Sequence, residues 1–330
     1  MTRLLKNILL ILLPVIVMLA VYLVYDPFEV IYASKTHYKD PHINYNWDYN
    51  QTETLIRNYA ERRYDSFIFG SSRSLAFRCS DWQKHIDSTR TLHYAAAAET
   101  LYGIHTKFTY LAAHDMPIRN CLILLDTGLM AVTWNSSGLL YLKHPKLSGD
   151  SLADFHLTFF RAFMDHSFFL GYVTYKATGT VPKMFRHKFL DGQIVDPVTG
   201  DKIRSDWDKA LAENSDRYYE NLKAFFYPRD ETKKSYHPAV IKKVQLQYLT
   251  EIRQILAANG TNYKVIISPN YDQKYIDRDD LARLQEIFGR ENVYDYSGIN
   301  DFTRDFHNYY EPSHFRPTVA RGIMEEVYRR

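Results

Sequence analysis

The fold is decided by the stretch Ser66-Phe67-Ile68-Phe69-Gly70-Ser71-Ser72-Arg73-Ser74, in which a short apolar run ends in glycine and small polar residues. This profile is typical of a buried parallel strand that delivers a loop at its carboxyl end. Glycine lets the backbone turn sharply, and the next N–H groups at a helix start would stabilise an oxyanion or a phosphate. Ser72 is therefore a candidate nucleophile, although small polar residues after a strand are also ordinary turn chemistry.

Short apolar runs like the one at residues 66–69 recur along the chain, with helical patterns between them. We expect further strands at residues 91–95, 121–125, 263–267 and 293–296. We expect helices at residues 53–63 with Thr52 as the N-cap, and at 99–114, 239–258, 279–288 and 317–328. Strands that alternate with helices indicate an α/β protein whose parallel sheet is covered on both faces.

One interval, residues 131–236, breaks this alternation. A phenylalanine-rich segment at 151–175 is followed there by a polar, basic region punctuated by glycine and proline. Such an insertion after the third strand would lie above the carboxyl edge of the sheet, where open α/β sheets bind ligands. We expect it to shape a substrate cleft or a partner surface. The alternative is a helical subdomain that completes a larger core.

A second polar motif lies near the end of the chain, in Tyr310-Glu311-Pro312-Ser313-His314-Phe315-Arg316-Pro317. The carboxylate of Glu311 comes three residues before His314, in a short loop that leads into the last helix. This spacing lets the carboxylate accept from one imidazole nitrogen while the other nitrogen faces a nucleophile. A histidine in a polar loop can also be no more than a solvated side chain.

Taken together, the two motifs resemble the SGNH (GDSL-like) hydrolase superfamily. The resemblance covers residues 66–328 apart from the insertion, and it implies a three-layer, flavodoxin-like parallel sheet. It also implies that Ser72 attacks an ester carbonyl, that His314 relays the proton, and that Glu311 holds the imidazole tautomer. More narrowly, the phrases YDSFIFGSSRS and YEPSHFRP look like those of bacterial membrane-anchored SGNH-like proteins, akin to the ones that assist teichoic acid D-alanylation and alginate acetylation.

The chain departs from the family pattern at three blocks. Glu311 replaces the family's aspartate and adds a methylene, so its backbone must retreat to keep the hydrogen bond. The family's oxyanion-hole glycine is missing from residues 94–99, where the Ala97 N–H is the candidate donor. The Asn-bearing third block is also missing, and Thr127 or Arg73 could substitute for its amide. Asp126 could be functional or could cap the turn that follows its strand.

The N-terminus carries the strongest compositional signal. Arg3 and Lys6 precede an uncharged apolar run at residues 8–25, and acidic residues follow it. This pattern predicts a transmembrane anchor at 1–25 with the rest of the chain outside the cytoplasm, in the periplasm. A cleaved signal peptide is the alternative. An irregular juxtamembrane linker is expected at 26–50 and the main domain at 51–330.

Composition excludes several classes of function. The 41 basic residues are nearly balanced by 38 acidic ones, so there is no electrostatic footprint for nucleic acid. Two cysteines, Cys79 and Cys121, cannot form a disulfide framework and are interpreted as core residues, although they could pair in an oxidising compartment. We expect no metal and no cofactor, because the histidines lack metal-ligand spacing and no nucleotide-binding motif is present.

The functional hypothesis is an extracytoplasmic serine esterase or O-acyltransferase that acts on a cell-envelope glycan through an acyl-serine intermediate. The 15% aromatic content would suit a surface that binds sugar rings. A membrane-bound acyltransferase is a candidate partner. The alternative is a non-catalytic SGNH-like scaffold for such an acyltransferase or for a polysaccharide, favoured by the missing third block and by Glu311.

Overall fold

The computed structural model describes residues 2–32, 40, 42–190, 193–226 and 230–329. Parts of the expected linker (33–39 and 41) and of the expected insertion (191–192 and 227–229) therefore lie outside the described residues.

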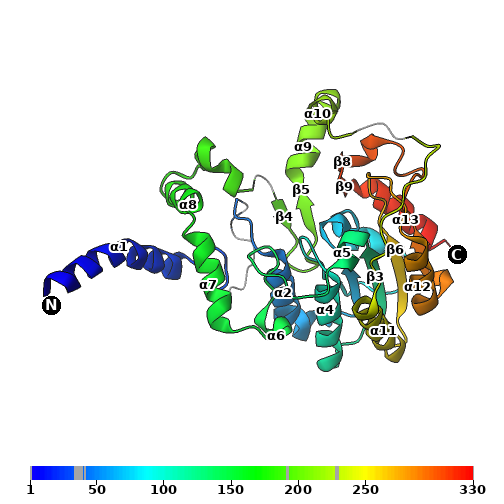
Figure 1. The fold of residues 1–330 in the computed structure, drawn as a ribbon, viewed down its shortest axis with the longest axis horizontal. Coiled ribbons are helices and arrows are strands. Elements are labelled where there is room, and N and C mark those ends of the chain that lie inside the picture. The colour runs from blue at the N-terminus through cyan, green and yellow to red at the C-terminus, as the bar shows by residue number, and fades with distance from the viewer. Residues whose placement is uncertain (1, 33–39, 41, 191–192, 227–229, 330) are drawn as a thin grey trace.

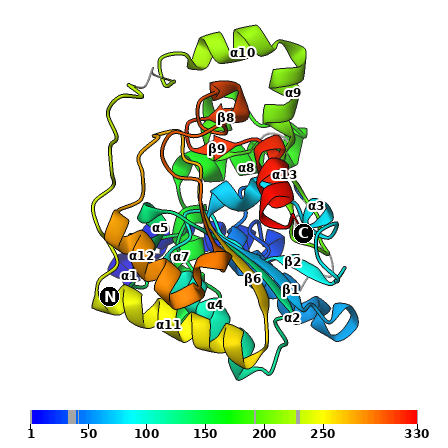
Figure 2. The same cartoon turned by 90° about the vertical axis from the view of Figure 1, so that its right-hand side faces the viewer.

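A five-stranded parallel sheet forms the centre of the molecule, in the order β2-β1-β3-β6-β7 (Figure 2). Its strands are β1 (Ser66–Phe69), β2 (Thr91–His93), β3 (Asn120–Leu125), β6 (Asn262–Ile267) and β7 (Val293–Asp295). This is the flavodoxin-like order, in which the connections diverge on either side of β1 and β3 and leave a ligand-binding crevice at the carboxyl edge. The expected α/β class and the parallel sheet are confirmed.

Helices cover both faces of the sheet, as Figure 2 shows. One face carries α2 (Trp47–Arg62), α4 (Leu101–Ala113), α11 (Lys243–Ala258) and α12 (Arg278–Phe288). The other carries the 3-10 turn η1 (Ser72–Ala76), α3 (Cys79–Trp82) and α13 (Pro317–Val327). Strand residues alternate between the two cores, since Phe67 and Phe69 belong to the first and Ile68 to the second.

The two cysteines are unpaired and fully buried. Cys121 lies in the core on one face of the sheet and Cys79 in the core on the other. Burial raises the pKa of both thiols. Their interpretation as small core residues is confirmed.

The first helix of the main domain begins earlier than its sequence pattern predicts. The N-cap of α2 is Asn46, whose side chain accepts from the Tyr49 N–H at 2.8 Å. Thr52, the expected cap, is buried inside the helix and donates to the Asp48 carbonyl at 3.2 Å. The sequence pattern missed the first turns because several buried positions of this helix carry polar residues, so apolar residues do not recur there at helical spacing.

The expected transmembrane helix is wrong. Its segment forms α1 (Thr2–Tyr25), which projects from the body of the molecule in Figure 1. No helix in the described part of the chain is long and apolar enough to cross a membrane. The last turns of α1 pack on protein, since the buried Tyr22 ring lies 5.4 Å from the rings of Phe160 and Phe163. The location outside the cytoplasm stays a prediction.

The first half of the insertion builds a third, aromatic core. It comprises α6 (Pro145–Ser148), α7 (Leu152–Phe163), α8 (His166–Thr178) and the 3-10 turn η2 (Lys183–Lys188). The described parts of the expected linker join this core, because Phe28, Ile43 and Tyr45 are buried in it. This half therefore follows the alternative prediction of a helical subdomain.

The second half of the insertion lies at the carboxyl edge of the sheet, as the cleft prediction requires. It consists of the hairpin β4 (Gln193–Val195) and β5 (Lys202–Arg204), followed by α9 (Ser205–Glu213) and α10 (Ser215–Leu222). These elements lie beside a C-terminal hairpin formed by β8 (Tyr309–Glu311) and β9 (His314–Phe315) (Figures 1 and 2). Three short helical elements complete the chain, namely α5 (Thr127–Ala131), η3 (Arg290–Asn292) and η4 (Phe306–Asn308).

Candidate active site

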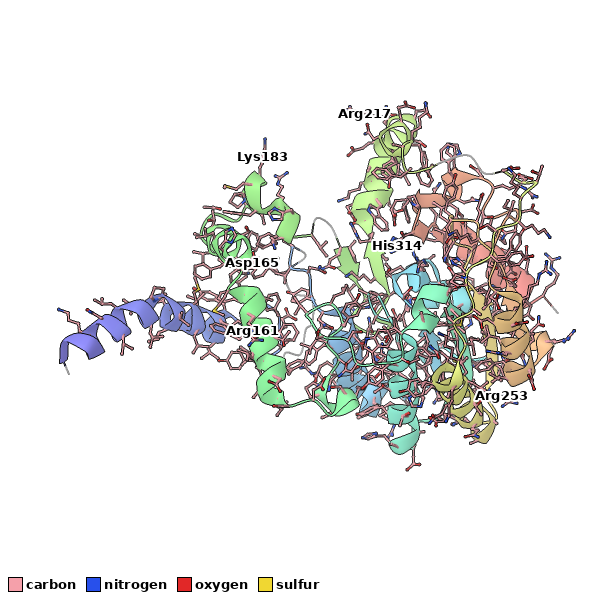
Figure 3. All side chains as sticks on the ribbon, in the orientation of Figure 1. Arg161, Asp165, Lys183, Arg217, Arg253 and His314 are labelled. Atoms are coloured by element: carbon pink, nitrogen blue, oxygen red, sulfur yellow. The ribbon has the colours of Figure 1, made fainter. Side chains whose placement is uncertain are left out.

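Ser72, His314 and Glu311 meet at the carboxyl edge of the sheet. Ser72 opens η1 directly after β1, while Glu311 and His314 flank the turn of the β8–β9 hairpin. His314 Nε2 lies 2.8 Å from Ser72 Oγ, and His314 Nδ1 is hydrogen-bonded to Glu311 Oε1. Figure 3 labels His314 where this hairpin faces β5. The arrangement is that of a nucleophile, its base and the acid that orients the base.

The hydrogen bonds select one tautomer of His314. A carboxylate only accepts, so Nδ1 must carry the proton that Glu311 receives. The lone pair of Nε2 then faces the Ser72 hydroxyl and can take its proton. The side chains of His314 and Glu311 are 21% and 30% exposed, so substrate can reach the pair without either group being fully solvated.

Glu311 is held in its charged form. Burial alone would raise its pKa, but the hydrogen bonds from His314 and from the Ser313 N–H, at 2.9 Å, outweigh burial. The positive charge of Arg73 acts in the same direction, so the pKa lies below its ordinary value. The β8–β9 pairing shifts register between Tyr309 and Glu311, and such an irregularity re-aims a side chain.

The nucleophile turn requires glycine at position 70 because the backbone is crowded there. A Cβ on Gly70 would lie 3.0 Å from the Ser74 Cβ and 3.1 Å from the Leu124 Cβ. Contacts this close force the neighbours to move. Glycine therefore brings the start of η1 against β3, which places Ser72 at the edge of the sheet.

A buried chain of hydrogen bonds supports this turn from below. Ser74 Oγ donates to the Ser71 carbonyl at 2.7 Å and lies 2.9 Å from His93 Nε2. His93 Nδ1 lies 3.1 Å from Asp201 Oδ1, and Asp201 also accepts from the Cys79 N–H at 2.9 Å. Ser74 and His93 are fully buried. Asp201 belongs to the insertion, so its contacts with His93 and the Cys79 N–H hold the insertion against the turn that carries the candidate nucleophile.

The loop after β2 lies beside the nucleophile turn, as an oxyanion-hole loop should. The Ala96 N–H donates to the Gly70 carbonyl at 3.2 Å, and Ala98 adopts a left-handed conformation with φ of 49°. Among the described residues, no backbone carbonyl accepts from the Ala97 N–H. Ala97, the sequence candidate for an oxyanion donor, therefore lies in the loop that contacts the nucleophile turn through Ala96.

A buried group of four charges anchors that loop. Glu99, which ends it, bonds Lys107 of α4 and, at 3.1 Å, Lys143 of the insertion. Both lysines also reach Asp48 of α2, at 3.0 and 2.6 Å. Burial disfavours the charge on Lys143, but Asp48 and Glu99 together raise its pKa above the ordinary value. Two cations facing two anions hold α2, α4 and the segment just before α6 around the loop.

The remaining sequence candidates lie near the triad without joining it. Asp126 caps α5, accepting from the Leu129 N–H at 3.0 Å, and its other oxygen pairs with Arg73 at 2.8 Å. This is the structural role that the sequence left open. Within the described residues, no hydrogen bond joins the Thr127 side chain to Ser72 or His314. Arg73 acts on the site through its charge on Glu311.

The insertion supplies a wall that no sequence motif predicts. A pocket beside Ser72 and His314 is also lined by Arg78, Lys202, Arg204, Trp207 and Tyr310. The Trp207 and His314 rings lie 5.2 Å apart, and Arg204 lies 4.2 Å over the Trp207 ring. The only sequence signal for Lys202, Arg204 and Trp207 was the basic character of the insertion above the sheet edge.

No family model and no curated protein matches the chain. Among the described residues, no cluster of histidine, cysteine, aspartate or glutamate could hold a metal ion. The chemistry available at this site from the chain's own groups is proton transfer between Ser72 and His314.

Proposed function

We propose that this protein is a serine ester hydrolase or O-acyltransferase of the SGNH type that works through an acyl-Ser72 intermediate. The observation that carries the proposal is the 2.8 Å contact between His314 Nε2 and Ser72 Oγ, with Glu311 on the opposite imidazole nitrogen. Residues 242 positions apart form this contact without any rearrangement of the fold.

Each step of the reaction uses a group of this site. Ser72 Oγ attacks the ester carbonyl carbon while its proton passes to His314 Nε2, and the N–H groups of Ser72 and Ala97 receive the oxyanion. The tetrahedral intermediate then breaks the bond to the alkoxy oxygen, which takes the proton from His314 and leaves as the alcohol. Water or an acceptor hydroxyl attacks acyl-Ser72 and loses its proton to His314. The second tetrahedral intermediate then breaks its bond to Ser72 Oγ, which takes that proton back, and the carboxylic acid or the new ester leaves.

A scaffold role is the second candidate, and the geometry speaks against it. A scaffold does not need a histidine on the serine hydroxyl or a carboxylate held in its charged form on that histidine. An O-acylated glycan remains the proposed substrate class. Trp207 and Tyr310 support it, because they line the pocket beside Ser72 and aromatic side chains suit a surface that is partly apolar and partly hydrogen-bonding.

The proposal is tested with a fluorescent fluorophosphonate, which reacts covalently with an activated serine. The wild-type protein should be labelled, and Ser72→Ala should abolish the label. Ser80→Ala is the matched control, since Ser80 is exposed on α3 and should label like wild type. A folded wild-type protein that takes no label would contradict the enzyme proposal and favour the scaffold.

A further inference from the structure

The pocket beside Ser72 is basic. Its lining includes Arg78, Lys202 and Arg204, and no carboxylate lines it among the described residues. An ester entering this pocket would therefore pass a surface with three cationic side chains and one imidazole.

Two of these cations already have carboxylate partners. Arg204 holds Asp206 through two hydrogen bonds, at 2.9 and 2.5 Å. Arg78 lies 3.9 Å from Asp208, a long contact, and its buried Nε has no hydrogen-bond partner among the described residues.

Lys202 differs from both arginines. Within the described part of the chain, no carboxylate lies within ion-pair distance of its ammonium group. Its Nζ lies over the ring of Trp47, 5.9 Å from the ring centroid. Arg204 repels it, and Asp206, the acidic residue that attracts it, is engaged by Arg204.

A partly buried lysine without a counter-charge is costly to the fold. Burial, reinforced by the positive charge of Arg204, lowers the pKa of Lys202 to about 8. An anion bound in the pocket would supply the missing counter-charge and relieve this cost. A lysine that lines a pocket beside a candidate nucleophile and has a shifted pKa is a candidate for a binding site.

We propose that Lys202, together with Arg78 of the same pocket lining, forms a subsite for an anionic group, a carboxylate or a phosphate, carried by the ester substrate. The inference rests on the proposed esterase function and narrows its substrate class to negatively charged acyl esters. The charge can sit on the acyl part or on the alcohol part, because both parts of an ester lie next to the nucleophile.

The test compares matched charged and neutral esters. On the acyl side, the 4-nitrophenyl hemiester of adipate is paired with 4-nitrophenyl hexanoate. On the alcohol side, 4-acetoxybenzoate is paired with 4-acetoxybenzamide. The readout is the ratio of kcat/KM values within each pair, compared between proteins, so that differences in intrinsic ester reactivity cancel.

For at least one pair, Lys202→Met should lower the charged-to-neutral ratio by about tenfold or more, which is the size expected when a charged hydrogen bond is lost. Lys202→Arg should restore most of the ratio. Lys209→Met removes an exposed lysine from α9 and should leave the ratio within about twofold of wild type. Ratios unchanged by Lys202→Met in both pairs would overturn the inference.

A binding measurement separates this inference from the proposed function. Ser72→Ala protein should bind the adipate hemiester, and the added Lys202→Met change should weaken that binding about tenfold by calorimetry. If wild type hydrolyses no ester yet this difference appears, the esterase proposal fails and the anion subsite stands. If hydrolysis occurs but neither ratio nor binding depends on Lys202, only the subsite is overturned.

Discussion

The indole ring of Trp207 packs against the imidazole of His314, with 5.2 Å between the ring centroids. Trp207 belongs to α9 of the insertion and His314 to the C-terminal hairpin, so two segments far apart in the sequence share one wall of the site. Tyr310 stands behind the indole, with its ring 5.0 Å away. The position of the candidate base therefore depends on the insertion.

Trp207→Ala should lower kcat by about 10- to 100-fold, because the imidazole loses a packing partner and small misplacements of a base are costly. Trp207→Phe should recover part of this loss. The measurement is ester hydrolysis, with Trp134→Ala as the control, since Trp134 is 60% exposed. Equal activities for Trp207→Ala and Trp134→Ala would contradict the role of this wall.

Glu311→Gln should lower kcat by about 100- to 10,000-fold while leaving KM within a few fold. A neutral amide can donate to Nδ1 and stabilise the wrong tautomer, so that Nε2 no longer accepts the Ser72 proton. Glu311→Asp should retain more activity because the charge remains. Steady-state kinetics and fluorophosphonate labelling rates test this prediction, and a Gln variant as active as wild type would refute it.

Lys143→Met should reduce the free energy of unfolding by about 3–5 kcal/mol, because it leaves Asp48 and Glu99 buried with one cation instead of two. Urea unfolding measures the change. Lys146→Met is the matched control, since Lys146 is exposed on α6 and should change stability by less than about 0.5 kcal/mol. Similar losses for the two variants would show that the buried charges do not hold the loop.

Lys202 should destabilise the fold at neutral pH. Its pKa falls from 10.5 in the unfolded chain to about 8 in the folded protein, so the folded state binds this proton less tightly. The penalty is fully present below pH 8 and is relieved as the pH rises from 8 to 10.5. Lys202→Met should therefore be about 1–3 kcal/mol more stable than wild type at pH 7 and lose most of this advantage by about pH 10. Thermal unfolding at several pH values measures the difference, and a variant less stable than wild type at pH 7 would indicate a structural lysine.

Asp201→Asn should lower both stability and kcat, because the acid faces His93 in the buried chain that supports Ser74. Losing one partner of a buried polar pair costs about 1–3 kcal/mol. The fluorophosphonate labelling rate should fall as well, since the turn that carries Ser72 loosens. Asp301→Asn, at a side chain 96% exposed, is the control. A destabilised variant that labels at the wild-type rate would confine the role of Asp201 to stability.

Local patterns predicted most of the sheet and its helices. The expected strands at 121–125 and 263–267 and the expected helix at 279–288 agree with β3, β6 and α12 to within one residue at each end. Buried parallel strands and amphipathic helices can be predicted from the sequence, because each has a characteristic spacing of apolar residues. The pattern failed where burial was polar, as in α2, whose first turns carry Asp48, Asn50 and Gln51.

The apolar N-terminal run was also misread from local pattern alone. Its composition resembles that of an anchor, but no described helix meets the length and apolarity needed to span a membrane. Aromatic residues of the insertion pack against this helix, as in the contact between Tyr22 and Phe163. Contacts between segments that distant in the chain leave no periodic signal in either one.

The sequence by itself determined that a serine follows a buried parallel strand and that a glutamate precedes a histidine by three residues near the end of the chain. Only the tertiary structure decided that Ser72 and His314 meet at 2.8 Å, because the parallel sheet brings the end of β1 and the C-terminal hairpin to one edge. It also decided that Lys202 and Trp207 line the pocket beside Ser72. Both residues reach the pocket because the insertion folds back over the sheet. This folding depends on long-range packing and on the buried contact between Asp201 and His93, and no local sequence pattern predicts such a contact.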